Sequence, residues 1–351
     1  MPEMKNQFRD IELSNFRGFD HIEISALSKI NVFVGANNVG KTSVLEAVFM
    51  LAGMSNPFIP TRVNYLRTLS AVNADLNNAR YLFHNMDFNN APLLRASIGD
   101  GVRRLTFSPI MRGSDEPSNG TSIHSDIIRL DFKFDTNLTG DFNFQSALFL
   151  GSDGSLQQTI DNRYTEGLNC LFISTDKNDG NATNNFASIV KYNKKQLVVE
   201  ALQDLDPAIE TIEALPDGLY LKLRNMCELL PISMAGDGIR RMINIISSVF
   251  VENYNILLVD EIDNGMHYSA HKLLWSAIMK FVVRHDIQMF VTTHNIECLQ
   301  SLANAMKEAP EFQAVANVYN IARTAKEGFQ AYRYSYDELK EAIDNEMEIR
   351  R

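Results

Sequence analysis

Apolar residues near the start of the chain follow first a strand period and then a helix period. Short β-like runs at Ile11–Leu13 and Ile22–Ile24 flank the segment Asn15–Gly18, and Ile30–Val34 is a largely β-branched run followed by a glycine. Its length and composition predict a buried strand. Beyond Gly40 the apolar positions take the i, i+3, i+4, i+7 spacing of a helix: Val44, Ala47, Val48 and Leu51.

The last third of the chain repeats this order. Ile256–Val259 is an apolar strand that ends at two acidic residues, and Ile287–Val291 is a second strand that ends at Thr-Thr-His. Between them a helix is marked by three apolar positions: Leu274, Ile278 and Phe281. Strands that alternate with helices predict an α/β fold with a parallel or mixed core sheet, whose ligand sites lie at the carboxyl ends of its strands.

Residues 55–230 have a different pattern. Apolar and polar residues alternate over Ile128–Phe134, which predicts a half-buried antiparallel strand. The polar, Gly-containing segments 112–122 and 175–185 are expected to be loops. The region therefore predicts an antiparallel β subdomain.

Two more elements are predicted farther along this region. Apolar residues over Val198–Ile212 gather on one face and predict a helix. The segment Leu215–Leu219 contains Pro, Asp and Gly and predicts a turn into another strand, Leu219–Leu223. We therefore expect a helical part beside the β subdomain.

Composition and charge exclude several classes of protein. The 351 residues contain 33 Lys+Arg and 43 Asp+Glu, a net charge of −10, which argues against coating nucleic acid through bulk positive charge. The start of the chain lacks the apolar core of a secretory signal, and the apolar stretch Val44–Met54, interrupted by Glu46, is too short to span a bilayer. Cys170, Cys227 and Cys298 are too far apart for a zinc motif. We expect a cytoplasmic protein with no membrane partner.

Residues 35–42 match the complete phosphate-loop pattern G-x-x-x-x-G-K-[ST], between a predicted strand and a predicted helix. The glycines let backbone N–H groups point at phosphate oxygens, Lys41 adds a positive charge, and the Thr42 hydroxyl can bind Mg²⁺. We therefore expect ATP and Mg²⁺ as ligands. The expected nucleotide contacts are Gly35, Ala36, Asn37, Asn38, Val39, Gly40, Lys41, Thr42 and Ser43.

Acidic and imidazole groups follow two later strands. Asp260 ends the strand Ile256–Val259 in the manner of a Walker B element and is a candidate ligand of Mg²⁺ through water. Glu261, the next residue, is a candidate general base for the attacking water. His294 ends the following strand and is a candidate sensor of the γ-phosphate, because imidazole can donate a hydrogen bond in either charge state.

A glycine-rich turn at Gly236-Asp237-Gly238 precedes Arg240 and an apolar helix over Ile243–Val249. Such a turn can be a simple helix start, but it can also bind an anion, and Arg240 adds charge.

In this order the motifs resemble an ABC-type ATPase head. They are more similar to the SMC, RecF and overcoming-lysogenization-defect (OLD) ATPases than to transporter ATPases. Four segments also resemble a stand-alone OLD-like branch of prokaryotic AAA-type ATPases: Leu13–Phe19, Gly35–Thr42, Met234–Arg241 and Leu258–Tyr268. The resemblance covers nearly the whole chain. It implies a single P-loop head, 1–351, with residues 1–54 and 231–351 as the nucleotide-binding core and 55–230 as an insertion.

The resemblance also implies a homodimer, or a higher homo-oligomer, that holds ATP between two protomers. One protomer would supply the phosphate loop and the Walker B acids, and the other would supply Gly236, Gly238 and Arg240 in trans. Residues 264–267 would be the D-loop at the dimer seam. The chain departs from the transporter pattern because Gly236-Asp237 replaces the signature serine.

Three further positions take their roles from the resemblance alone. His294 would be the switch histidine, and Asn15 and Arg17 resemble residues that flank the nucleotide. No glutamine of the middle region can be placed as a Q-loop.

Two absences narrow the expected function. Residues 55–230 contain no long heptad pair, so the coiled-coil arms of SMC proteins are not expected. The segment after His294 is shorter than a typical small domain, so we do not expect the Toprim nuclease of full OLD proteins. Nuclease or toxin activity would then belong to a separately encoded effector, in anti-phage defence or DNA maintenance. The charged tail Tyr336–Arg351 is expected to be a helix.

Alternatives remain at this point. The same phosphate loop would serve a nucleotide-gated scaffold with negligible turnover, and a transporter ATPase fits the signature turn and the β-rich insertion less well. DNA is a possible partner if three pairs of basic residues form a local patch: Arg103-Arg104, Lys194-Lys195 and Arg240-Arg241.

Overall fold

The computed structural model describes residues 7–67, 76–99, 101–112, 127–137, 142–174, 186, 189–204, 206–236, 239–245, 254–264, 266–345 and 349. The chain divides into two compact units. The first contains residues 1–27, 36–168 and 321–332, and the second contains residues 28–35, 169–320 and 333–351.

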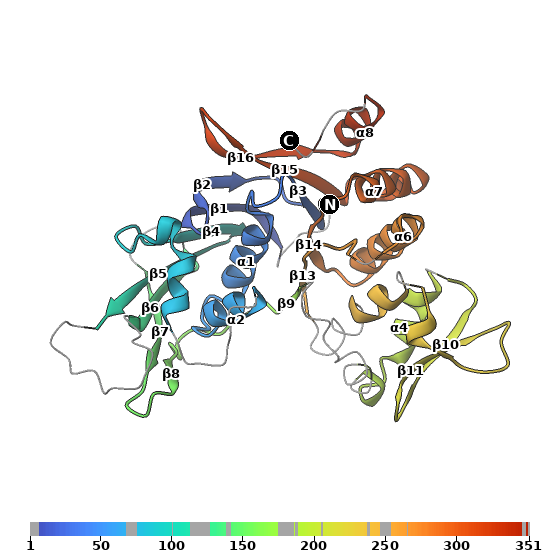
Figure 1. Ribbon diagram of the computed structural model, residues 1–351, viewed down its shortest axis with the longest axis horizontal. Coiled ribbons are helices and arrows are strands. Elements are labelled where there is room, and N and C mark those ends of the chain that lie inside the picture. Colours follow the sequence, from blue (N-terminus) through green and yellow to red (C-terminus); the bar gives the residue numbers. More distant parts are fainter. Residues whose placement is uncertain are drawn as a thin grey trace. The chain divides into compact units, whose positions relative to one another are not determined.

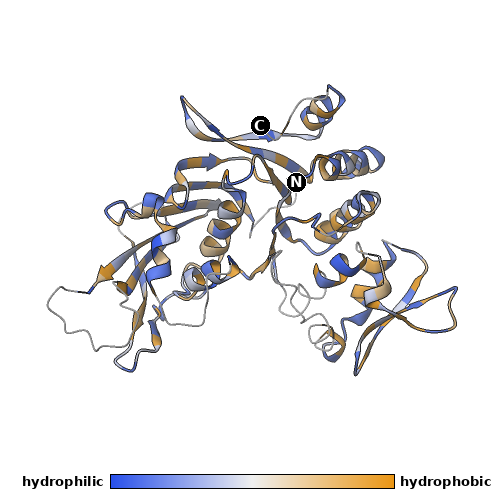
Figure 2. Ribbon diagram, in the orientation of Figure 1, coloured by the Kyte–Doolittle hydropathy of each residue, from blue (hydrophilic) through white to orange (hydrophobic). Residues whose placement is uncertain are grey.

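The first unit contains an antiparallel sheet, with the strand order β2-β1-β4-β5-β6-β7-β8 over the described residues (Figure 1). Its strands are β1 (Phe8–Phe16), β2 (Phe19–Ile24), β4 (Leu93–Ile98), β5 (Gly101–Met111), β6 (Ile127–Asp135), β7 (Phe144–Leu150) and β8 (Leu156–Thr159). Figure 2 colours these strands by hydropathy, and side-chain burial alternates along the first part of β5, the pattern of a strand with one buried face. The alternation predicted over Ile128–Phe134 is confirmed as β6.

One long helix of the first unit packs on this sheet. α1 (Lys41–Ala52) is buried from Ser43 to Ala52 and contacts β4 and β5. Arg103 of β5 donates from Nε to the carbonyl of Leu51 at 2.7 Å and from Nη2 to that of Ala52 at 3.2 Å. A cation at this end satisfies carbonyls that have no partner inside the helix. α2 (Ile59–Leu66) and short 3-10 helices at Leu76–Leu82 and His84–Met86 follow.

A mostly parallel sheet has most of its strands in the second unit, while most of β16 and the end of β15 belong to the first. The strand order is β16-β15-β3-β14-β13-β9, and the printed pairs of β3, β9, β13, β14 and β15 are parallel. The strands are β3 (Ile30–Val34), β9 (Cys170–Ile173), β13 (Ile256–Val259), β14 (Gln288–Thr292), β15 (Ala316–Thr324) and β16 (Gly328–Tyr334). All residues of β3, β13 and β14 are buried, as expected of strands covered on both faces.

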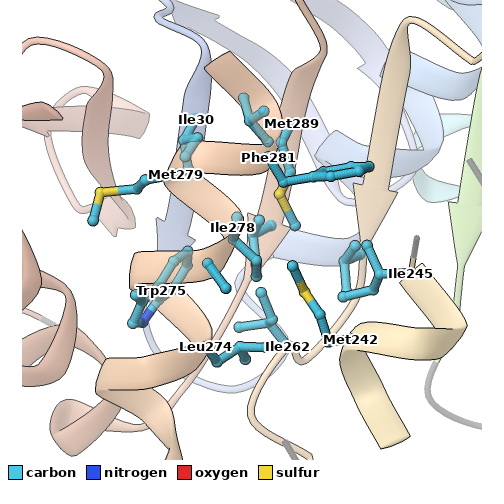
Figure 3. Packing of buried hydrophobic residues seen from close by; sticks show 14 of the residues in the cluster. Ile30, Met242, Ile245, Ile262, Leu274, Trp275, Ile278, Met279, Phe281 and Met289 are labelled. Carbon is cyan, nitrogen blue, oxygen red and sulfur yellow. The ribbon is translucent and has the colours of Figure 1, made fainter. Parts of the chain in front are cut away.

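Helices of the second unit bury one face each against a shared apolar cluster. They are α4 (Lys195–Gln203), α6 (Tyr268–Arg284), α7 (Ile296–Glu308) and α8 (Tyr336–Asp344). α6 and α7 lie side by side (Figure 1), and Figure 3 shows Leu274 and Ile278 of α6 gathered with Met242 and Ile262. α7 is capped by the Asn295 side chain, and α8 begins with a capping box.

A small antiparallel sheet, β10-β11-β12, also belongs to the second unit. Its strands are β10 (Ile209–Leu215), β11 (Gly218–Leu223) and β12 (Leu230–Pro231), followed by a 3-10 helix at Ile232–Met234; another lies at Pro310–Phe312. The turn predicted at Leu215–Leu219 is confirmed, because the β10–β11 register closes at Leu215 and Gly218.

The helix predicted over Val198–Ile212 is wrong beyond Gln203, because Ile209 and Ile212 lie in β10. Pro207 has no N–H to donate to the helix and disfavours helical geometry at the residue before it. The Asp206 carboxylate also accepts the Ala208 N–H at 2.9 Å, which forms a local turn that competes with the helix. Ile209 and Ile212 therefore pack in the same apolar cluster as the buried residues of α4, but from a strand and not from the helix.

The strands predicted at Ile30–Val34 and Ile256–Val259 are confirmed in full, and that at Ile287–Val291 is shifted by one residue. The predicted loops 112–122 and 175–185 lie, apart from Arg112, outside the described residues. The helix predicted over Ile243–Val249 is confirmed for residues 243–245, which belong to a helix that is described over 239–245, and the rest of the prediction lies outside the described residues. The predicted C-terminal helix is α8, shorter than expected, with Leu339 and Ala342 buried. No helix in the described part of the chain is both long and apolar enough to cross a bilayer.

Candidate nucleotide site

The phosphate loop leaves β3 at Gly35 and ends where α1 begins at Lys41. Three of its residues have positive φ: Gly35 at 141°, Asn38 at 62° and Gly40 at 107°. Glycine and asparagine adopt this region more readily than other residues. Lys41 Nζ donates to the carbonyl of Ala36 at 2.9 Å, which folds the lysine back over its own loop.

The start of α1 suits a bound anion. Among the described residues no side chain caps this helix start, and its first turn contains no acidic residue. The first N–H groups of a helix have no partner inside the helix and carry its partial positive charge. Ala36, Asn37 and Asn38 are exposed, Val39 to Thr42 are partly exposed, and Ser43 is buried. The loop therefore presents backbone donors and a lysine where phosphate oxygens can reach them.

Gly40 gives a direct test of this geometry. A Cβ at this position would lie 2.4 Å from Cζ of Phe19, and the φ of 107° is unfavourable for any other residue. Phe19 is fully buried and packs edge-to-face on Phe329, with ring centroids 4.9 Å apart, so it cannot easily move away.

We expect Gly40→Ala to lower the free energy of unfolding by about 1–3 kcal/mol and to weaken ATP binding, as measured by urea denaturation and calorimetry. Gly18→Ala is the matched control, because a Cβ there meets no atom within 4 Å. Equal effects of the two substitutions would show that the loop geometry is not constrained at Gly40.

A buried ion network lies beneath the phosphate-loop helix in the first unit. Glu46 of α1 has no exposed side-chain surface and pairs with Arg17 Nε at 3.0 Å and with Arg67 Nε at 2.5 Å. Arg67 Nη2 also donates to the hydroxyl of Ser43 at 3.1 Å. The helix start is thus tied by side chains to both the N-terminal hairpin and the segment after α2.

The structure places Arg17 inside this network. Its Nη1 donates to the carbonyl of Tyr81 at 3.0 Å and its Nη2 to Oδ1 of Asn64 at 2.9 Å. Burial lowers the pKa of Arg17 from its ordinary value, and the attraction of Glu46 opposes that shift. Asn15 and Arg17 both have positive φ, at 54° and 55°. Arg17 therefore helps to position α1, and the nucleotide contacts expected of Asn15 and Arg17 stay predictions.

The Walker B acids end β13 in the second unit. Asp260 Oδ1 accepts a hydrogen bond from the Thr292 hydroxyl at 2.5 Å, and the same hydroxyl accepts the Glu261 N–H at 2.8 Å. Glu261 has a positive φ of 45°. β3, β14 and β13 are neighbours and parallel. The strand ends that carry Gly35, His294 and Asp260 therefore share one edge of the sheet.

His294 lies beside the proposed base. Its Nδ1 is 3.8 Å from Oε1 of Glu261, and the two side chains are 55% and 44% exposed. The preceding residue, Thr293, is buried and donates to Oδ1 of Asp263 at 2.6 Å. The structure thus brings Asp260, Glu261 and His294 together in the second unit, with one carboxylate and the imidazole accessible to solvent.

Parts of the signature turn and the D-loop are described. Gly236 is exposed, and its carbonyl accepts the Arg240 N–H at 3.1 Å at the start of the helix. Gly238 lies outside the described residues, as does Gly265 within the D-loop segment 264–267. His267 caps α6 by accepting the Ser269 N–H. The trans contacts expected of Gly236, Gly238 and Arg240 stay predictions.

Several of the basic residues considered for DNA binding form ion pairs within the protein. The Arg103 and Arg104 side chains are 6% and 13% exposed and pair with Glu166 at 2.7 Å and with Asp135 at 3.1 Å. Lys195 pairs with Glu213 at 2.6 Å. The hypothesis of a solvent-facing patch is therefore wrong for Arg103 and Arg104, because an unpaired buried guanidinium would be costly and both are neutralised locally.

The sequence interpretation missed several residues around the site. Glu46 stands out in hindsight as a charged residue within an apolar helix, a pattern that signals a buried pair. Arg67, Arg241 and Thr292 carried no such signal, because their partners are distant in sequence or are backbone groups.

Comparisons with known proteins found relatives in sequence and in fold. An ATP/GTP phosphatase of Helicobacter pylori is 22% identical, with the match covering 86% of this chain and 88% of that protein. The DNA replication and repair protein RecF of Geobacter sulfurreducens is 52% identical over 46 residues, 13% of each chain. The crystal structure of the Smc head bound to the C-winged helix domain of ScpA has a TM-score of 0.50 at 13% identity and covers 94% of this chain and 98% of its own.

These likenesses define the fold and the family. The structural match shows an SMC head-like α/β ATPase fold, as the sequence predicted. The AAA ATPase domain family matches residues 7–213, more than half of the chain. The protein is therefore a member of the AAA ATPase domain family.

Proposed function

We propose that the protein is an Mg²⁺-dependent ATPase whose nucleotide cycle controls head dimerisation and, through it, a separately encoded effector. The observation that carries the proposal is the shared sheet edge. There the phosphate loop starts after β3, and the parallel neighbours β14 and β13 end in His294 and in Asp260-Glu261.

The residues present suit a bound Mg²⁺. Mg²⁺ prefers oxygen ligands and commonly uses one or two protein groups together with substrate phosphates and waters. We propose the Thr42 hydroxyl and the Asp260 carboxylate as its protein ligands; Oδ1 of Asp260 accepts a hydrogen bond from Thr292. When bound, Mg²⁺ would neutralise charge on the β- and γ-phosphates.

The chain's own residues then have distinct roles. The backbone N–H groups of the phosphate loop and the Lys41 ammonium bind and orient the phosphates. Glu261 accepts a proton from the attacking water at its carboxylate, and His294, near the same carboxylate, donates a hydrogen bond to the γ-phosphate oxygens. Their solvent exposure is what a group that meets water and substrate requires.

The wider role rests on resemblance. The motif order is similar to ABC-type heads that close on ATP as dimers, and to OLD-like ATPases of anti-phage defence or DNA maintenance. The Smc head found in the comparison is bound to a partner domain, which supports a protein partner here. We therefore propose a homodimer that contacts an effector, with a nuclease or toxin as the candidate and DNA as a possible ligand.

The test is steady-state phosphate release by the purified chain, with Mg²⁺ or with EDTA, and with or without DNA. We expect Mg²⁺-dependent turnover that Lys41→Ala abolishes together with ATP binding, because the lysine charge is lost from the phosphate loop. Lys272→Ala is the matched control, since Lys272 lies on the surface and pairs with Glu308.

Turnover that survives Lys41→Ala would contradict the assignment. Tight ATP binding without measurable turnover would instead favour a nucleotide-gated scaffold. Capture of a partner by the ATP-bound Glu261→Gln form, but not by Lys41→Ala, would support control of an effector.

A further inference from the structure

The backbone of Glu261 is held in an unusual conformation. Its φ of 45° lies in the left-handed region, which L-residues other than glycine, asparagine and aspartate rarely adopt. Such a conformation persists only where the surroundings impose it, and it concentrates at functional sites. The direction of the Glu261 carboxylate depends on this backbone.

Thr292 holds one side of this backbone. Its hydroxyl accepts the Glu261 N–H at 2.8 Å and donates to Asp260 Oδ1 at 2.5 Å. Its carbonyl accepts the Ile262 N–H at 3.1 Å. One buried threonine therefore contacts three consecutive residues at the end of β13.

Arg241 holds the other side. Its Nη2 lies 3.3 Å from the carbonyl oxygen of Asp260 and 3.4 Å from that of Glu261, and it donates to both. The Nε of Arg241 is buried and has no hydrogen-bond partner among the described residues. Burial lowers the pKa of Arg241, and the carboxylates of Asp263 and Asp260 oppose that shift. Burying a guanidinium costs free energy. Here the buried group donates to the two carbonyls on either side of the left-handed residue.

We propose that Arg241 and Thr292 are positioning residues, which together fix the backbone of Glu261 and so aim its carboxylate at the attacking water. The inference rests on the proposed role of Glu261 as general base. It also connects two motifs, because Arg241 lies on the helix whose start is bonded to Gly236 of the signature turn. A movement of that helix would therefore shift the Glu261 backbone through the hydrogen bonds of Arg241.

Arg241→Met and Thr292→Val test the inference, since both keep the approximate volume and remove the hydrogen bonds. We expect kcat to fall by about tenfold or more, because a small misplacement of a catalytic group costs up to about 10²-fold. The ATP Kd should stay within about twofold of the parental value, because the phosphate loop is unchanged. Thr292→Ser, which retains the hydroxyl, should recover most of kcat, and Arg241→Lys should recover part of it.

Arg284→Met is the matched control for Arg241→Met. The Arg284 side chain is 47% exposed and lies 3.7 Å from Asp204 and 4.0 Å from Glu200, neither of which belongs to the proposed site, so kcat should not change. Circular dichroism and thermal melting check that each variant is folded. If Thr292→Val or Arg241→Met does not fold, Arg241→Lys still tests the inference: kcat should fall while the ATP Kd and the melting temperature stay close to the parental values, and a parental kcat would overturn the role of Arg241.

A double-mutant cycle shows whether Arg241 acts on kcat through Glu261 or independently of it. In the Glu261→Gln background, Arg241→Met should cause little further loss, because its target is already removed. A full additional loss there, or a parental kcat for both Arg241→Met and Thr292→Val, would overturn the inference while leaving Glu261 as the base. Parental turnover by Glu261→Gln alone would overturn the base assignment itself, and the inference with it.

Discussion

Glu261→Gln is expected to lower ATP turnover by about 10²- to 10⁴-fold, the usual contribution of a positioned general base. Glutamine keeps the shape of glutamate but cannot accept the proton of the attacking water. ATP binding should persist, because the phosphate loop and Lys41 are intact. The bound nucleotide would then be hydrolysed only slowly, and we expect a long-lived ATP-dependent dimer in sedimentation velocity.

Two measurements make this result decisive. Phosphate release and ATP Kd should be determined on the same preparation, so that loss of turnover is not confused with loss of binding. Glu311→Gln is the matched control, because Glu311 is exposed and follows α7, outside the proposed site. Hydrolysis at the parental rate by Glu261→Gln would disprove the general-base assignment, and a monomer in saturating ATP would count against the dimer.

Glu46→Ala is expected to lower the free energy of unfolding by about 3–5 kcal/mol, the cost of removing one partner of a buried ion pair. The Arg17 side chain is only 7% exposed and would keep its charge without a carboxylate. Arg67 is 40% exposed and can turn toward water, so most of the cost comes from Arg17. Urea denaturation monitored by circular dichroism measures the change.

The matched control is Glu308→Ala, which removes an ion pair with Lys272 in which both side chains are largely exposed. A surface pair contributes about 0–1 kcal/mol, so this variant should unfold close to the parental midpoint. The double variant Glu46→Leu, Arg17→Met should be more stable than Glu46→Ala, because it removes the buried Arg17 charge and leaves only Arg67, which is 40% exposed, without its carboxylate. A loss below about 1 kcal/mol for Glu46→Ala would show that the network is dispensable.

Local signals identified the elements that carry the chemistry. The strands at Ile30–Val34 and Ile256–Val259 are short apolar runs ended by glycine or by acids, and both were predicted with their observed bounds. The helix after Gly40 follows from its apolar spacing. These predictions succeed because burial on both faces of a parallel strand, or on one face of a helix, leaves a pattern within a few residues.

The helix predicted over Val198–Ile212 shows where such patterns fail. The same apolar spacing continues through Ile209 and Ile212, but Pro207 and the Asp206 turn end the helix, and β10 pairs with β11 instead. An apolar run of this length does not distinguish a helix from a short strand; pairing with another segment does.

The sequence by itself determined the candidate residues for nucleotide chemistry: a phosphate loop with Lys41, and two acids and a histidine at later strand ends. Only the tertiary structure decided what surrounds these groups. It buried Arg103 and Arg17 in ion pairs, although both were candidates for ligand contacts, and it placed Arg241 and Thr292 on the backbone of Glu261. The sequence does not show these contacts, because the partner of a buried charge or of a strained peptide depends on the packing of segments that lie far apart in the chain.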